Sequence, residues 1–318
     1  MKKRLLVVIL ALVLVPAAQV ECSPGQVTVV CTTTALQSVV QQVGGTHVDV
    51  ITLVQPGICP SHFDVRPSHV ADIQKAQLVL YHGMESWLQG LITASGNETI
   101  TQVQVVGPWN TPELALEKID TIKDALIAVD PENSQYYTEN CNTARTELSD
   151  LATTILNKAS AEHVKEISVI CMEWQKFIVE WMGFSVADTY DPPETLSVKD
   201  VNSLIQTGHT YNAVLVIDSL QSGTNVGSQI AADIGAYHVV LTNFPYAVPE
   251  TDTLAQMIEY NANQLLTAVQ TYQEHKTIAE LEHTLTKERQ TTDIFQAVCV
   301  ILLIVCIAEA VLLYTRQQ

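Results

Sequence analysis

The sequence predicts an α/β fold with two lobes of mainly parallel sheet flanked by helices, joined by a long linking helix and followed by a helical stalk and a transmembrane helix. Short β-branched runs alternate with segments of helical spacing in both halves of the chain. A stretch from Pro131 to Lys165 has no internal Gly or Pro, and 21 nearly continuous apolar residues run from Ile294 to Tyr314. With 318 residues, the chain is long enough for two ordinary domains.

The charge balance restricts the class of partner. The chain carries 34 acidic and 16 basic residues, which gives a formal charge of -18. Nucleic acid is excluded as a partner, because its binding needs a basic surface that releases counterions. An acidic exterior attracts cations instead. Seven cysteines in a chain of this length are too few for a disulfide scaffold.

The first 22 residues are predicted to be a secretory signal peptide. Basic residues open the chain, Leu5–Val15 is an unbroken apolar run, and Pro16-Ala17-Ala18 supplies small residues before the cleavage site. The segment Val20-Glu21-Cys22 is a poor site for lipoprotein processing, because Glu21 stands where a small residue is needed. We therefore expect the membrane anchor at the other end of the chain.

Residues 23–130 are expected to form the first α/β lobe. The β-branched strand Val27–Val30 is followed by helical spacing over Leu36–Val43, and a glycine pair then leads into a second strand, Val48–Val54. The alternation continues with a helix at Val70–Ala76, a strand at Leu78–Tyr81, a helix at Glu85–Ile92 and a helix opened by proline at Pro112–Val129. Such alternation is typical of a parallel sheet that is covered on both faces.

Residues 131–165 are expected to be one linking helix between two lobes. Asp130-Pro131-Glu132 supplies a cap, a first-turn proline and a first-turn acid. At about 1.5 Å per residue this helix would be roughly 50 Å long, which is more than one lobe requires. Residues 166–265 then repeat the pattern of the first lobe, with strands at Ile167–Ile170, Ser185–Thr189, Ala213–Ile217 and His238–Leu241 and a helix at Gln175–Met182.

The remaining residues are expected to form a helical stalk, residues 266–293, and a membrane span, residues 294–314. In the stalk, Ile278, Leu281 and Leu285 have the three-then-four spacing of a coiled coil. The apolar stretch that follows is close to the roughly 20 residues that a helix needs to cross a bilayer. A cleaved signal followed by a late hydrophobic segment places the body outside the cell and Arg316 inside.

Several segments between Val27 and Leu266 resemble the solute-binding proteins of zinc and manganese ABC transporters. In that family a first strand of the type V-V-T-T precedes V-G-G-x-x-V-x-V-x-x-L-V and P-G-x-D-P-H-x-Y-E-P-x-P-S-D. The corresponding segments here are Val29–Thr33, Val43–Val54 and Pro56–His69, the last of which reads PGICPSHFDVRPSH. Order and spacing also hold at Ala76–Gly83, Pro108–Pro112, Ala128–Asn133 and Pro192–Glu194.

The resemblance implies two α/β lobes on a rigid linking helix, with a metal ion held between the lobes and delivered to an ABC permease. The ligand residues depart from the family pattern. The histidine of the D-P-H motif corresponds to Ser61, the second histidine to Gly107 and the third ligand to Met172. The fourth ligand, an acid, corresponds to Thr242 or Asn243. The usual ligand set is therefore absent.

Neighbouring residues still offer metal chemistry. Cys59 and His62 lie three apart in one loop, and Cys171 and Glu173 flank Met172 at a strand end that is expected to face that loop. Thiolate and imidazole suit zinc, and copper becomes an alternative if Met172 also binds. Manganese is kept as a further alternative because the family includes manganese receptors.

Two assignments stay open at this stage. Cys59 and Cys171 are either ligands or structural cysteines, and a disulfide formed between them outside the cell would lock the lobes together. Asp218 follows the strand Ala213–Ile217 at the edge where open α/β sheets bind ligands, so it is a metal ligand, a hydrogen-bond acceptor behind one, or the cap of the following loop.

The function expected from the sequence is that of an extracellular, membrane-anchored solute-binding protein that captures a transition-metal ion, with zinc first, and delivers it to an ABC permease. An enzyme is not expected, because the sequence contains no H-E-x-x-H, G-x-S-x-G or phosphate-loop motif. One alternative is a two-lobed surface protein that has lost metal binding and acts through a partner. The other is a metal-dependent hydrolase with Glu173 as its base.

Overall fold

The first lobe contains a four-stranded parallel sheet with the strand order β2-β1-β3-β4. The computed structural model describes residues 25–316, and the predicted signal peptide lies outside them. The strands are β1 (Val27–Cys31), β2 (Val48–Thr52), β3 (Leu78–Tyr81) and β4 (Thr101–Gln104). Helices α1 (Thr34–Gly44) and α4 (Pro112–Val129) cover one face, and α2 (Pro67–Lys75) and α3 (Leu88–Ser95) cover the other.

The alternation of side chains along β1 explains these two layers. Val29 and Cys31 point into the core shared with α1 and α4, whereas Val30 packs with Ile73 of α2 and Leu91 of α3. Because both faces are covered, the central strands β1 and β3 are apolar along most of their length, which is why the sequence identified them. Strand β4 was not predicted, since its sequence TQVQ alternates apolar with polar residues at the sheet edge.

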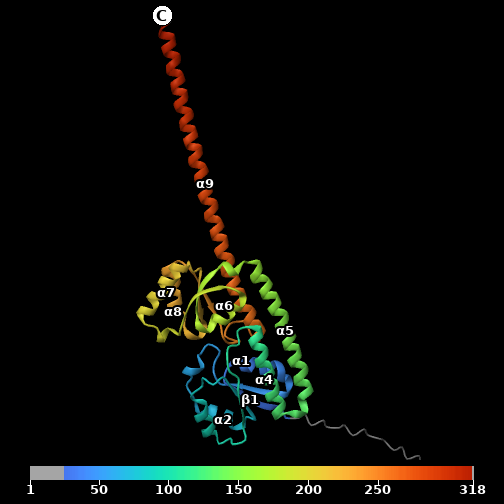
Figure 1. Ribbon diagram of the computed structural model, residues 1–318. Coiled ribbons are helices and arrows are strands. Elements are labelled where there is room, and N and C mark those ends of the chain that lie inside the picture. Colours follow the sequence, from blue (N-terminus) through green and yellow to red (C-terminus); the bar gives the residue numbers. More distant parts are fainter. Residues whose placement is uncertain (1–24, 317–318) are drawn as a thin grey trace, which may run out of the picture.

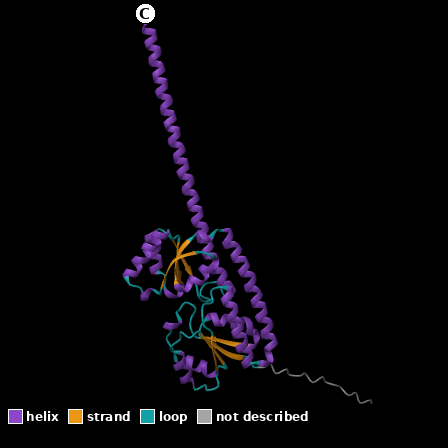
Figure 2. Cartoon of the chain, viewed as in Figure 1, coloured by secondary structure: helices purple, strands orange, loops and turns teal. Residues whose placement is uncertain are grey.

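The second lobe repeats the topology of the first. Strands β5 (Ser168–Met172), β6 (Ser185–Tyr190), β7 (Leu215–Ser219) and β8 (Tyr237–Leu241) are parallel and lie in the order β6-β5-β7-β8. Helix α6 (Lys176–Met182) contributes to the core shared with the first lobe, and α7 (Val198–Tyr211) and α8 (Asn225–Ile234) cover the opposite face. Figure 2 shows the two sheets as separate layers stacked one above the other.

The expected linking helix is present as α5 (Ser134–Ala161), which runs beside both lobes in Figure 1. It is shorter than the predicted range at both ends. Residues Pro131–Asn133 form a separate 3-10 turn, and the Asp130 carboxylate fixes the junction by accepting hydrogen bonds from Tyr137 Oη (2.5 Å) and Asn133 Nδ2 (2.7 Å). At the other end His163 adopts a left-handed conformation (φ 51°) that ends the helix.

Helix α9 (Leu254–Arg316) joins the body to the apolar C-terminal segment without a break. Its first turns are buried, and Leu254, Ile258, Leu265 and Val269 belong to one continuous core that also contains residues of both sheets and of α5. The helix then leaves the body as the long straight rod in Figure 1. By length and composition it can cross a membrane, since it contains a window of mean hydropathy 2.3 of which none is buried.

Candidate metal site between the lobes

The carboxyl edges of the two sheets face each other, and four direct hydrogen bonds join the two lobes. In each lobe the strand order switches from one side to the other between the first and third strands, which is where open α/β sheets place ligands. The bonds run from Thr34 Oγ1 to Pro245 O (2.8 Å), from Gln221 Nε2 to Pro56 O (2.9 Å), from Asn110 Nδ2 to Trp174 O (2.8 Å) and from Tyr246 Oη to Gln41 Oε1 (2.8 Å). We call the region crossed by these four bonds the interlobe seam.

On the first lobe, the edge at the seam is occupied by a buried polar cluster around Glu85. Its carboxylate accepts hydrogen bonds from Thr32 Oγ1 (2.5 Å), from the His82 backbone N–H (3.0 Å) and from the Gly83 backbone N–H (2.7 Å). The side chain is only 6% exposed. With three donors in place, Glu85 serves to hold the ends of β1 and β3 together.

His82 completes this cluster with both ring nitrogens in use. Nδ1 lies 3.0 Å from the Val105 carbonyl oxygen, and since a carbonyl only accepts, Nδ1 carries the proton. Nε2 then accepts from Thr33 Oγ1 at 2.7 Å. Burial lowers the pKa of His82 below its usual value of 6.5, against the opposing effects of the Glu85 charge and the Val105 carbonyl. His82 is therefore a neutral structural histidine with no lone pair free for a metal.

On the second lobe, the edge at the seam is a network of neutral amides and hydroxyls. Gln221 donates to Thr242 Oγ1 (2.9 Å) and accepts from the Asn243 backbone N–H (3.0 Å), while Gln175 Nε2 donates to Asn243 Oδ1 (3.0 Å). The side chain of Asn261 on α9 binds the backbone of Thr242. Its Oδ1 accepts a hydrogen bond from the Thr242 N–H (3.0 Å), and its Nδ2 donates one to the Thr242 carbonyl oxygen (2.8 Å). The position where the family places its acidic ligand is thus tied to the helix that leaves the body.

Cys59 and His62, the two predicted ligands of the first lobe, lie in the loop after β2. The loop is held by Trp87 Nε1, which donates to Pro60 O (2.9 Å), and by packing of Phe63 on Trp87 with ring centroids 4.8 Å apart. Cys59 is half-buried with its sulfur 3.1 Å from Ser61 Oγ, and His62 is exposed. Both side chains are accessible, and Cys59 comes three residues after Pro56, which belongs to the seam.

Cys171 and Asp218, by contrast, are fully buried inside the second lobe. Cys171 lies in the core shared by the two lobes, and burial, assisted by the charges of Glu173 and Glu180, raises the pKa of its thiol to about 12. Asp218 accepts hydrogen bonds from Tyr190 Oη (2.5 Å) and pairs with His238 Nε2 (2.7 Å). Cys171 is a free cysteine committed to core packing, and Asp218 is committed to internal hydrogen bonds.

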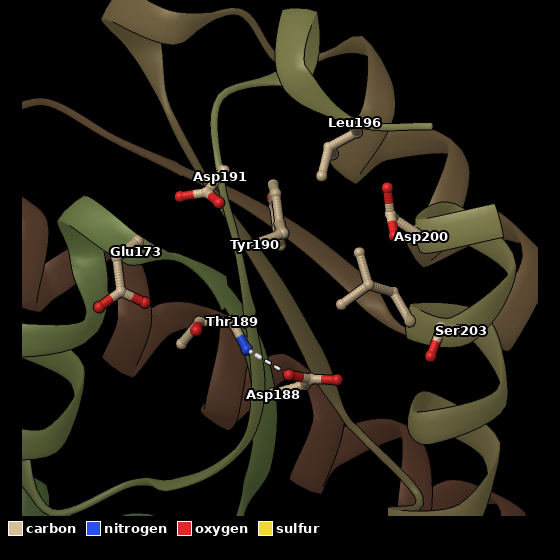
Figure 3. Close-up of a pocket in the computed structure, with 9 residues that line it drawn as sticks. Glu173, Asp188, Thr189, Tyr190, Asp191, Leu196, Asp200 and Ser203 are labelled. Atoms are coloured by element: carbon tan, nitrogen blue, oxygen red, sulfur yellow. Dashed lines mark hydrogen bonds between the residues drawn. The ribbon is translucent and has the colours of Figure 1, made fainter. Parts of the chain in front are cut away.

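Glu173 is half-buried and borders a cavity of about 280 Å³ in the second lobe. Figure 3 shows Glu173 and Asp191 on one side of this cavity and Asp200 and Ser203 of α7 on the other. Asp188 also lines it, with its carboxylate accepting from the Thr189 N–H at 2.9 Å. Four carboxylates around one hollow create a negative potential that attracts cations. Glu173 also precedes Trp174, whose carbonyl takes part in the seam.

The five predicted ligands do not form one cluster in this structure. Within residues 25–316, no three His, Cys, Asp or Glu side chains lie close enough together to hold one metal ion. Instead the seam brings together amide groups, and two of them keep a buried oxygen without a hydrogen-bond partner, Asn110 Oδ1 and Gln175 Oε1. These oxygens are the acceptors at the seam that remain free for a ligand or for water.

Sequence reasoning missed most of the residues that form the seam. Asn110, Gln175 and Gln221 belong to no metal-ligand pattern, since amides are weak ligands and occur in many loops, and Asn243 was considered only as a counterpart of the family's acidic ligand. One signal was available, because each follows the end of a strand on the edge that binds ligands in open α/β sheets. The rule that ligands bind at the carboxyl ends of strands would have identified these amides if it had been applied to all polar residues there, and not only to Cys, His, Asp and Glu.

Comparisons with known proteins agree with this architecture. The family model described as "Zinc-uptake complex component A periplasmic" matches residues 29–268. The chain belongs to this family. It is 22% identical over 247 residues to a "Putative metal-binding protein" of Treponema pallidum (strain Nichols), a match that covers 65% of this chain and 76% of that protein. The family is one of solute-binding proteins, which are not enzymes.

Two solved structures show the same fold. The Mn-bound periplasmic metal binding protein from Candidatus Liberibacter asiaticus superposes with a TM-score of 0.68 at 17% identity, covering 77% of this chain and 100% of that one. The crystal structure of ZnuA superposes with a TM-score of 0.66 at 20% identity, covering 77% of this chain and 99% of that one. The residues matched by the family model form the two-lobed body, and the fold of this family supports metal binding for transport.

Proposed function

We propose that this chain is an extracellular, membrane-anchored solute-binding protein that captures a transition-metal ion between its lobes and delivers it to an ABC permease. The observation that carries the proposal is the meeting of the two carboxyl sheet edges at the seam, in a chain that belongs to the zinc-uptake family. Zinc is the preferred cargo because the accessible candidate ligands include a thiol and an imidazole, with copper and manganese as alternatives.

The ligands proposed for this ion are Cys59, His62 and Glu173, with Cys171 and Asp218 as further members after rearrangement. The first three are accessible and belong to segments that border the seam from opposite lobes. Cys171 and Asp218 would first have to give up their buried positions, and a thiol with a raised pKa enters coordination only after losing its proton at a cost. The acidic cavity beside Glu173 would concentrate cations near the seam.

Release of the ion to a permease requires the lobes to separate. The four direct hydrogen bonds across the seam each contribute only about 1 kcal/mol net, so they permit opening while favouring the closed form. The anchor is α9, whose apolar half is proposed to cross the membrane. This arrangement would keep the receptor at the surface, next to its permease.

Calorimetric titration of the reduced body, residues 23–276, with zinc tests the proposal. We expect His62→Ala and Glu173→Gln each to weaken zinc binding at least tenfold. His209→Ala is the matched control, because His209 is exposed on α7 and has no role at the seam. Affinity should also fall in acid, since ligands must lose protons to bind. Unchanged affinity in both ligand variants would reject this site.

A second candidate function is that of a two-lobed surface protein that acts through a partner and no longer binds metal. It is favoured by the residues at the family's ligand positions, Ser61, Gly107, Met172 and Thr242 or Asn243, and by the amide network that fills the seam. Elemental analysis of the reduced, zinc-reloaded body distinguishes the two candidates. A metal content far below one ion per chain would support this second function.

A further inference from the structure

The part of α9 between the body and the apolar segment carries large apolar side chains that contact nothing else in the described chain. Ile278, Leu281 and Leu285 are 53%, 59% and 57% exposed, although they precede the predicted membrane span. Their neighbours are polar or charged, so this segment is not itself a membrane helix. A stripe of exposed leucine and isoleucine in water indicates a surface that another helix covers.

The stripe has the geometry of a coiled-coil seam and continues into the apolar segment. Ile278, Leu281 and Leu285 follow the three-then-four spacing, and steps of seven residues from Leu285 lead through Thr292 to Cys299 and Cys306. A stripe that repeats every seven residues rotates around a straight α-helix by about 20° per heptad. Two helices that wind around each other with a left-handed twist keep their stripes in contact despite this rotation. Both cysteines are exposed in the single chain.

We propose that two copies of this chain pair in parallel along the α9 face that carries Ile278, Leu281, Leu285, Cys299 and Cys306. The pairing rests on the membrane anchoring proposed above, because two chains anchored in one bilayer with the same topology present their α9 helices in the same direction. Confinement to a membrane also raises the effective concentration of one copy near the other, so a short stripe can be sufficient.

The charges beside the stripe are compatible with a parallel pair. The positions that flank it are Thr277, Glu282, Thr284 and Arg289. In a parallel heptad register Thr277 faces Glu282 of the second copy and Thr284 faces Arg289 of the second copy, so no like charges oppose each other there. Glu288 is the one charged residue of the stripe before the membrane. It faces Glu288 of the second copy, and Arg289 beside it on each copy supplies the opposite charge that offsets this contact.

Disulfide trapping of the full-length chain in membranes tests the pairing. Copper–phenanthroline oxidises two facing thiols to a disulfide, and we expect a covalent dimer on a non-reducing gel. The double variant Cys299→Ser/Cys306→Ser should lose this dimer. On that background, Ile304→Cys is the matched control, because position 304 lies on the opposite face of the helix, and it should not restore the dimer.

A charge placed on the stripe gives a second readout. Leu281→Lys should reduce trapping at Cys299 and Cys306 at least fivefold, whereas Ala279→Lys, which adds the same charge on the outward face, should leave it unchanged. Equal trapping in Leu281→Lys and the parent chain, or a dimer through Ile304→Cys as strong as the parent's, would overturn the proposal.

Fractionation separates the failure of the pairing from the failure of the anchor. A chain that remains in the membrane pellet after an alkaline wash but forms no dimer overturns the pairing alone. A chain released by the wash overturns the anchoring and the pairing together, and leaves metal binding by the body to be judged by calorimetry.

Discussion

His82 shows how a single residue at a ligand-binding edge can be structural. It lies at the end of β3, where a ligand would be expected, yet its two nitrogens are bonded to Val105 and Thr33 and its ring meets the edge of Trp109 with centroids 5.5 Å apart. A protonated ring would lose the hydrogen bond from Thr33 and would add a charge inside a buried cluster. The fold therefore depends on the neutral form.

This dependence predicts an acid-sensitive stability. Burial lowers the pKa of His82 in the folded state, so the unfolded chain takes up the proton first as pH falls below 6.5. The contribution is fully present above 6.5 and is lost as pH falls toward the lower folded pKa. Urea unfolding between pH 7.5 and 5.5 should show this loss, and His82→Gln should be less stable at pH 7.5 but have a flatter profile. His209→Ala, on an exposed site, should keep the slope of the parent chain.

The candidate ligands could be predicted only in part, for reasons that lie in single residues. Cys59, His62 and Glu173 were placed near the seam because the resemblance supplied their loops. Cys171 and Asp218 were chosen because they lie at the carboxyl ends of strands. Whether such a residue reaches the ligand-binding edge or the interior depends on the direction of its side chain, and both of these side chains are buried. Asp218 turns inward because Tyr190 of β6 and His238 of β8 provide its partners. No one-dimensional pattern contains that information.

Elements with strong apolar patterns were predicted, and weakly patterned ones were missed. The buried strands β1, β3, β5 and β7 are apolar along most of their length, and β2, β6 and β8 were located as well. Helix α7 was missed because it buries only Leu204 and Gly208, although Ser197 and Asp200 form a capping box at its start. The order of the strands within each sheet was not predicted from the sequence.

Helix α8 offers a test of how closely an element must approach its sheet. A Cβ added at Gly227 would overlap the Asp218 carboxylate, whereas a Cβ at Gly90, the corresponding third residue of α3, would meet no atom within 4 Å. Gly227→Ala should therefore lower the free energy of unfolding by about 1–3 kcal/mol through overpacking. Gly90→Ala should raise it by about 0.5–1 kcal/mol through helix propensity. Thermal unfolding measures both, and equal effects would contradict the close packing.

At the scale of the whole molecule, α9 joins the seam to the proposed anchor. Asn261 binds Thr242 at the seam, and the same helix continues without interruption to Arg316. The two-lobed body and the exposed part of α9 are therefore connected by one continuous helix. A movement of the 242–246 loop would displace Asn261 and, with it, α9. The sequence separated a stalk from the second lobe at residue 266, but the buried side chains of Leu266 and Val269 show that the core extends further along the helix.

Truncation along α9 measures where the body ends. A fragment of residues 23–276 keeps every buried α9 side chain and the contact between Tyr237 Oη and His275 Nδ1, so it should unfold at the same temperature as residues 23–293. A fragment of residues 23–262 lacks Leu265, Leu266 and Val269, each of which contributes about 1.5–3 kcal/mol when buried. The sum is comparable to the whole stability of an ordinary domain, about 5–15 kcal/mol. We therefore expect the shorter fragment to be unfolded or barely stable, and a midpoint equal to that of residues 23–276 would show that α9 is only attached to the body and is no part of its core.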